Sequence, residues 1–198
     1  MHCTACGEEV GLLHECRGVP AAIQAILQES SPPLKFAPLL YLREAIAILR
    51  LDEKAILRNS RDNNALLYGA LLWIVAITPI MVVAIRAQSS SSVLLVATLI
   101  IATPVLLGLQ LAIWGVCHLA ARFALHGKGD FLGIARVLLL GSIVQILIVI
   151  PVVGPLIGGL WAMAIMMFTF EAIHRIRRIH AFAISFIVGI LIRAVGLI

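Results

Sequence analysis

Long apolar blocks, separated by short polar connections, dominate the chain after its first third. The clearest block covers residues 65–85 and contains no charged residue, and further blocks cover 93–121, 132–150, 156–173 and 179–198. Four of these blocks lie within the ~17–25 residues that a helix needs to cross a hydrocarbon core of about 30 Å, and the block 93–121 is longer than needed. The pattern therefore predicts an all-α fold, a polytopic membrane bundle with five transmembrane helices.

Residues 39–61, before the first block, have a different pattern that predicts one amphipathic helix. Leucine and isoleucine recur near helical spacing, while basic residues share the other side: Arg43, Arg50, Lys54 and Arg61. Such a helix can lie on an anionic membrane surface, with its apolar side chains at the acyl boundary and its basic ones near phosphates. A helix packed on protein with a solvated charged face is the alternative. We favour the interfacial helix because the first span follows directly.

These patterns divide the chain into three parts. Residues 1–18 form a short segment with three cysteines, here called the Cys/His head, and residues 19–63 form a Pro-containing linker and the amphipathic helix. Residues 64–198 hold the five predicted spans. The first twenty residues contain three glutamates and no continuous apolar core, so we expect no cleavable signal peptide.

Composition strengthens the membrane assignment, because 62% of the 198 residues are hydrophobic and 13% are charged. A soluble domain has about 25% charged residues. The net charge of +5 does not indicate a nucleic-acid partner here, because the position of the positive charges matters more in a membrane protein.

The lysines and arginines are distributed unevenly between the two sides of the predicted bundle. Seven lie before the first span, three in the region 122–136 and three in the turn 175–178, whereas Arg86 and Arg193 are the two on the other side. The positive-inside rule then places the N-terminus and both basic loops in the cytoplasm. We expect a multi-pass protein of the cytoplasmic (inner) membrane, with the lipid bilayer as its first partner.

The Cys/His head contains candidate metal ligands. Cys3, Cys6, His14 and Cys16 supply four thiol or imidazole groups, the number that a closed tetrahedral zinc site requires. The second pair has one intervening residue, whereas a zinc ribbon would repeat the Cys-x-x-Cys spacing. Zinc is therefore the candidate cofactor. The alternatives are a tail of inert thiols, a redox pair, and a disulfide, which a reducing cytosol disfavours. Cys117 lies within an apolar block and is interpreted as a packing residue.

Polar residues inside the predicted spans are few. Gln145 lies near the middle of the third span, and Glu171 lies near the end of the fourth, spaced for a local ion pair with His174 and Arg175. His118 shares a helix face with Arg122, and both side chains are expected to reach lipid headgroups. Gln145 and Glu171 are the residues that would line a path in a transporter or channel.

No known catalytic motif is apparent in the sequence. It has no Ser/His/Asp set, no paired intramembrane carboxylates and no phosphate-binding Gly loop, and Gly127-Lys128-Gly129 follows no strand. We therefore expect no enzymatic activity, and the sequence identifies no small-molecule substrate.

Several short stretches resemble the prokaryotic branch of the Yip domain family, over roughly residues 41–198. They are His118-Leu-Ala-Ala-Arg122, the Gly127-Lys128-Gly129 loop ending in Phe131, Ile150-Pro-Val-Val-Gly-Pro155, Trp161 and Glu171-Ala-Ile-His174. The resemblance implies a cytosolic N-terminal segment and five spans, with a tight Pro-Gly turn between the third and fourth. Eukaryotic members are membrane adaptors that bind prenylated Rab-type GTPases, but their Asp-Leu-Tyr-Gly-Pro motif is missing here, so that role is not carried over.

Three hypotheses of function follow. The first is a non-enzymatic membrane adaptor or organiser of the Yip type, which binds a protein partner, or further copies of itself, through the head and the basic loops. The second is a small transporter or channel. The third is a regulator in which zinc bound to the head alters partner binding.

Overall fold

The computed structural model describes residues 37–88 and 91–194, and every regular element in these residues is helical. This confirms the predicted all-α class for the described part of the chain. The elements are α2 (Pro38–Leu49), α3 (Glu53–Arg61), α4 (Asn63–Gln88), α5 (Ser92–Ala124), α6 (Phe131–Gly141), the 3₁₀ helix η1 (Ser142–Val149), α7 (Val153–His174) and α8 (Arg178–Ala194).

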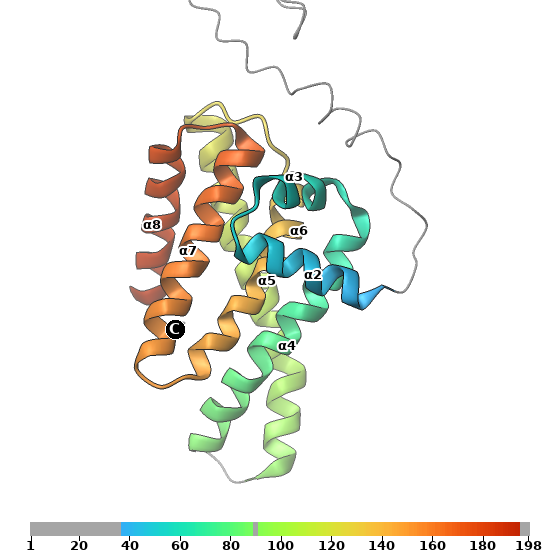
Figure 1. Cartoon of the computed structure of the whole chain (residues 1–198). Coiled ribbons are helices and arrows are strands. Elements are labelled where there is room, and N and C mark those ends of the chain that lie inside the picture. Colours follow the sequence, from blue (N-terminus) through green and yellow to red (C-terminus); the bar gives the residue numbers. More distant parts are fainter. Residues whose placement is uncertain (1–36, 89–90, 195–198) are drawn as a thin grey trace, which may run out of the picture. The chain divides into compact units, whose positions relative to one another are not determined.

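Helices α4, α5, α7 and α8, together with the continuous pair α6–η1, run alternately up and down (Figure 1). Helix α6 contacts α2, α3, α4, α5 and α7, so it lies at the centre of the packing. The α4–α5 hairpin extends past the turn that joins η1 to α7 (Figure 1). We call the end where α5 meets α6, and α7 meets α8, the basic-loop end.

Four segments are long and apolar enough to cross a membrane: Asn63–Ala87, Ser92–Ala124, Phe131–Val149 and Val153–His174. They overlap the first four predicted spans. Helix α8 has 17 residues, which at 1.5 Å per residue gives about 26 Å, a little less than the hydrocarbon core. The fifth span therefore stays a prediction.

Local caps explain where several helices begin. The Asp130 carboxylate accepts a hydrogen bond from the Gly133 N–H at 2.7 Å and starts α6, which is the usual role of aspartate at an N-cap. Ser91 accepts from the Leu94 N–H and starts α5. Arg175, in the left-handed conformation with φ 55°, ends α7.

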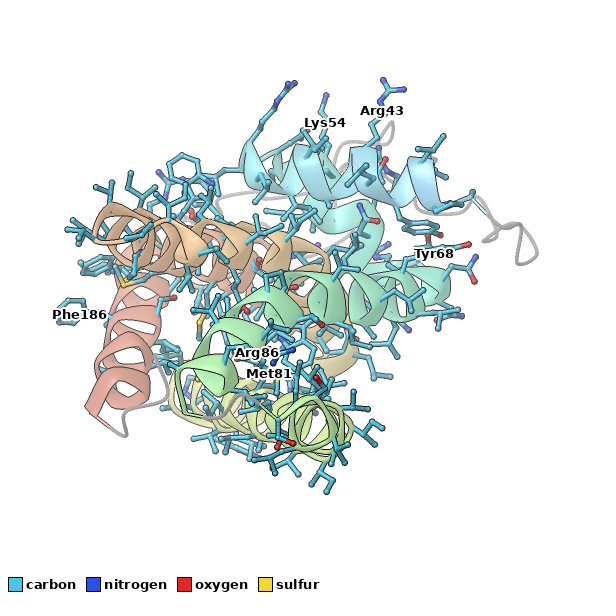
Figure 2. The ribbon with its side chains drawn as sticks, turned by 90° about the horizontal axis from the view of Figure 1, so that it is seen from below. Arg43, Lys54, Tyr68, Met81, Arg86 and Phe186 are labelled. Carbon is cyan, nitrogen blue, oxygen red and sulfur yellow. The ribbon has the colours of Figure 1, made fainter. Side chains whose placement is uncertain are left out.

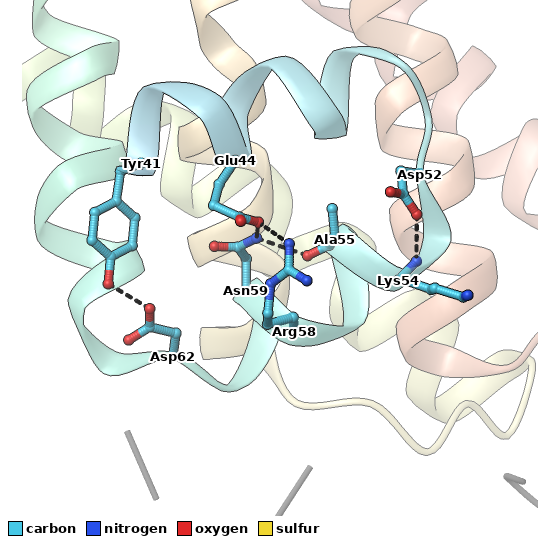
Figure 3. Close-up of polar contacts among 8 residues, drawn as sticks. All are labelled: Tyr41, Glu44, Asp52, Lys54, Ala55, Arg58, Asn59 and Asp62. Carbon is cyan, nitrogen blue, oxygen red and sulfur yellow. Dashed lines mark hydrogen bonds and ion pairs between the residues drawn. The ribbon is translucent and has the colours of Figure 1, made fainter. Parts of the chain in front are cut away.

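The prediction of one helix over residues 39–61 is wrong, because the segment forms two helices. Leu51 has φ 59° and reverses the chain after α2. The Asp52 side chain then accepts a hydrogen bond from the Lys54 N–H at 2.9 Å and starts α3 (Figure 3). Aspartate at an N-cap stabilises a new helix start. The apolar periodicity continues across this break in the backbone, which is why one helix was predicted.

Polar contacts join α2 to α3. The Tyr41 hydroxyl donates a hydrogen bond to Asp62, and the Asn59 amide donates to Glu44 at 2.7 Å (Figure 3). Arg58 pairs with the same Glu44 carboxylate. Burial, and then the neighbouring Asp62 carboxylate, raise the pKa of Tyr41 well above its ordinary value, so the hydroxyl remains a donor.

Helices α2 and α3 also pack on the bundle. The Tyr41 ring stacks on Tyr68 of α4 with centroids 4.2 Å apart. Trp161 of α7 donates to the Leu49 carbonyl at 2.8 Å, and Arg136 of α6 donates to the Ser60 carbonyl at 2.8 Å. Arg43 and Lys54 point away from the bundle (Figure 2). The pair α2–α3 thus has one face on protein and one exposed basic face, and its place at a lipid interface stays a prediction.

Candidate functional site

The two basic loops predicted from the sequence meet at the basic-loop end. The Lys128 N–H donates to the His174 carbonyl at 3.2 Å, and the Gly129 N–H donates to the His174 Nδ1 atom at 3.2 Å. The Gly127 N–H donates to the Ala121 carbonyl at 2.9 Å. Three successive backbone donors therefore fasten the loop 125–130 to the ends of α5 and α7.

Two glycines permit this close approach. A Cβ atom at Gly127 would lie 2.5 Å from His174 Nδ1, and one at Gly129 would lie 2.8 Å from the Ile173 carbonyl oxygen. Real Cβ atoms essentially never make contacts this short. The Gly-Lys-Gly sequence is therefore explained by packing of the loop backbone on α7.

Beneath the loop lies a buried pair of histidines. His118 of α5 and His174 of α7 are 6% and 1% exposed, and His118 Nδ1 lies 3.1 Å from His174 Nε2. His174 Nδ1 accepts the Gly129 N–H, so its proton lies on Nε2 and is donated to His118 Nδ1. Phe170 stacks on His174, and Phe131 meets His118 edge-on.

This pair corrects two expectations from the sequence. His118 does not extend toward the surface beside Arg122, because it is buried against a second imidazole. Glu171 pairs with Arg178 at 2.8 Å, while His174 faces the bundle. The missed pair joins residues 56 positions apart. The available signal was that both histidines end apolar blocks on the same predicted side.

Exposed cations surround the joined loops. We call this group the basic loop surface; its members are Arg122, Lys128, Arg175, Arg177 and Arg178. Among these, Arg178 is the one with an ion pair in the described residues. The Asp130 carboxylate, the nearest acid on the loop, is used in capping α6. The surface thus keeps a net positive charge.

The candidate zinc ligands Cys3, Cys6, His14 and Cys16 lie outside the described residues, so the zinc site stays a prediction. Among residues 37–88 and 91–194, no group of three or more His, Cys, Asp and Glu side chains is placed to hold a metal ion. Cys117 is buried and unpaired, as expected for a packing residue.

Gln145 and Glu171, the two residues of the transporter hypothesis, lie in different surroundings. Gln145 lines a cavity of about 300 Å³ between α5, α6–η1, α7 and α8. Glu171 is not among the residues of that cavity wall, and its carboxylate binds Arg178 at the basic-loop end. The structure therefore does not bring them together.

Comparisons with known proteins gave no match: no protein-family model, no curated protein and no solved structure is significantly similar to this chain.

Proposed function

We propose that this chain is a non-enzymatic membrane adaptor of the Yip domain type, which binds an acidic protein partner through the basic loop surface. The proposal is supported chiefly by the junction of the two basic loops at His174, through the Lys128 and Gly129 N–H groups. Two short cationic segments far apart in sequence are thereby held as one continuous surface.

The physical argument rests on charge and rigidity. Four of the five cations of the basic loop surface have no ion pair within the described part of the chain. Complementary charge accelerates encounter with an acidic partner and suppresses wrong partners. A loop already fixed by three backbone hydrogen bonds loses little conformational entropy on binding, so more of the interaction energy appears as affinity.

The distribution of cations along the chain supports a cytoplasmic location for this surface. Thirteen of the fifteen lysines and arginines fall in the N-terminal segment and the two basic loops. This bias is the one that orients bacterial membrane proteins with such loops inside. In this proposal α8 completes a fifth crossing, and the Cys/His head lies on the same side as the basic loop surface.

Site-specific photocrosslinking in native membranes tests the proposal. A photoreactive amino acid replaces His126, which is exposed on the loop. We expect a discrete adduct whose yield falls about tenfold or more in a Lys128→Glu, Arg175→Glu variant. The new glutamates would face an acidic partner, and such like-charge contacts cost several kcal/mol. A loss of about 1.4 kcal/mol already corresponds to a tenfold change in affinity. Arg43→Glu, which reverses an exposed charge on α2, is the matched control and should leave the adduct unchanged.

Two results would contradict the adaptor proposal. One is an adduct insensitive to charge reversal on the loops. The other is solute flux in proteoliposomes that disappears in both Gln145→Leu and Glu171→Gln variants, which would favour the transporter.

The zinc hypothesis for the Cys/His head has its own test. Metal content of the purified protein is compared with that of a Cys3→Ser, Cys6→Ser variant. One zinc per chain that is lost in the variant supports a folded head, and no zinc in either protein excludes it.

A further inference from the structure

The cavity beside Gln145 lies within the apolar bundle. It is bounded by α5, α6–η1, α7 and α8, has a volume of about 300 Å³ and has mostly apolar walls. Leu156, Leu160 and Phe186 belong to its wall and are also exposed on the outside of the bundle. Because these residues lie on membrane-spanning or apolar helices, the cavity opens toward lipid.

Glycines leave part of this space empty. A Cβ atom at Gly159 would meet nothing within 4 Å, and one at Gly189 would meet only the Met163 sulfur, at 3.8 Å. Both glycines belong to the cavity wall. This differs from Gly69, Gly127 and Gly129, where a Cβ atom would collide with packed protein. The room here is thus available to a molecule from outside the bundle.

Four side chains give the cavity its polar character. Ser142 donates to the Leu139 carbonyl and Ser185 to the Ala181 carbonyl, so both hydroxyls are satisfied within their own helices. Gln110 of α5 and Gln145 of η1 have no hydrogen-bond partner within the described residues. An amide left without a partner in a membrane interior costs free energy, so two of them on one cavity wall indicate a polar group in the occupant.

We propose that the cavity binds one acyl chain of a membrane phospholipid, and that Gln110 and Gln145 donate hydrogen bonds to its ester carbonyl. Phospholipid is the surrounding solvent of the bundle, so no transfer through water is needed. At about 30 Å³ for each water-sized group, the cavity accommodates roughly ten methylene groups. Amide N–H groups suit a carbonyl acceptor, and the apolar wall suits the chain below it.

The position of Gln145 along its helix fits this assignment. It precedes Ile150, at the turn into α7, by five residues, which is about 10 Å along a 3₁₀ helix. The polar layer of a bilayer is about 5–7 Å thick on each side. The proposal sets the η1–α7 turn in that layer, which brings the Gln145 amide toward the boundary where lipid esters lie.

Tryptophan fluorescence offers a direct test, because Trp114 belongs to the cavity wall and is only 5% exposed. The protein is reconstituted into bilayers of phospholipids brominated on the acyl chains, since bromine quenches tryptophan at short range. A Trp161→Phe background removes Trp161, which is 42% exposed, and leaves Trp73, which is buried by protein. We expect quenching in this background, and its loss when Trp114→Phe is added.

Two further variants separate occupation of the cavity from general access of lipid. Gly159→Leu adds an apolar side chain to the cavity wall at a position where a Cβ atom meets nothing within 4 Å, and should protect Trp114 from bromine. Gln110→Leu with Gln145→Leu keeps the volume and removes the donors, and should lower the phospholipid retained after detergent purification about tenfold, as expected for two neutral hydrogen bonds. Thermal unfolding confirms that each variant is folded.

The proposal is overturned if Trp114 is not quenched while Trp161, in a Trp114→Phe variant, is. Equal retention of phospholipid by the wild type and the double glutamine variant would also overturn it. Quenching of Trp114 by brominated free fatty acid but not by brominated phospholipid would assign the cavity to a different amphiphile and reject the phospholipid.

Discussion

Helix α5 and the α6–η1 segment are almost equally apolar, but they lie in opposite environments. The most apolar stretch of α5 contains no buried residue, whereas more than half of α6–η1 is buried inside the bundle. Lipid tails are as apolar as leucine side chains, so hydropathy alone does not distinguish a central helix from a peripheral one. The two helices differ instead in what surrounds them: α6 has five packed neighbours, and much of α5 faces outward.

Helix α5 itself shows both conditions. Its buried residues are Trp114, Cys117, His118 and Ala121, all in the part that approaches the basic-loop end. The part near Ser92 pairs with α4 in a hairpin that extends past the η1–α7 turn (Figure 1). Packing on α5 is therefore concentrated around the histidine pair, and four predictions test this contrast.

The largest expected effect is on a leucine of the central helix. Leu140→Ala removes a fully buried side chain and should lower the free energy of unfolding by about 2–5 kcal/mol, because the cavity left behind is only partly refilled. Leu109→Ala on the outward part of α5 is the matched control. Thermal unfolding in detergent measures both, and equal losses at the two positions would contradict the contrast between the helices.

Larger side chains introduced at two glycines test the same contrast. A Cβ atom at Gly69 of α4 would lie 2.8 Å from the Leu139 Cβ atom, so Gly69→Leu should cost about 1–3 kcal/mol or more. At Gly108 of α5 a Cβ atom would meet nothing within 4 Å, and Gly108→Leu should be tolerated. If Gly108→Leu destabilises the protein as much, α5 is packed against a surface not present in the described chain.

Loss of the histidine pair is expected to lower the free energy of unfolding by an intermediate amount. His174→Leu leaves the partly buried Gly129 N–H without its acceptor and should cost about 1–3 kcal/mol. Amide hydrogen exchange should rise at residues 127–129, whose donors fasten the loop. His180→Leu, on an exposed position of α8, should change neither quantity. Unchanged exchange in His174→Leu would mean that the loop does not depend on the imidazole.

The smallest effect is expected for Glu171→Gln. Its partner Arg178 is highly exposed, and solvent screens such pairs strongly. We expect no resolvable change in unfolding temperature at physiological salt, and a small loss at low salt, where screening is weaker. A large loss at physiological salt would show that the pair lies in a low-dielectric environment.

Much of this fold could be predicted from the sequence, because long apolar blocks require helices when lipid provides no hydrogen bonds. Four of the predicted spans coincide with the segments that are long and apolar enough to cross. The break between α2 and α3 was missed because Leu51 is apolar and continues the periodicity, while the left-handed backbone at that residue has no signal in hydropathy. Asp52 followed by Glu53 was the available signal for a new helix start.

The candidate site was predicted only in part. Both basic loops were identified from their lysines and arginines, but not their junction, because that depends on hydrogen bonds between residues 45 or more positions apart. The roles of Gly127 and Gly129 follow from the same contacts. Gln145 was recognised as polar within an apolar block, but its place on the same cavity wall as Gln110 depends on how α5, α6–η1, α7 and α8 come together.

The sequence by itself determined that the chain is helical, that it contains spans of membrane length, and on which connections its cations lie, since these are properties of contiguous residues. Only the tertiary structure decided which apolar faces meet protein and which meet lipid, and that His118 and His174 share a hydrogen bond. The reason is physical. In an apolar solvent the inward and outward faces of a helix need no difference in polarity, so they are distinguished by contact alone.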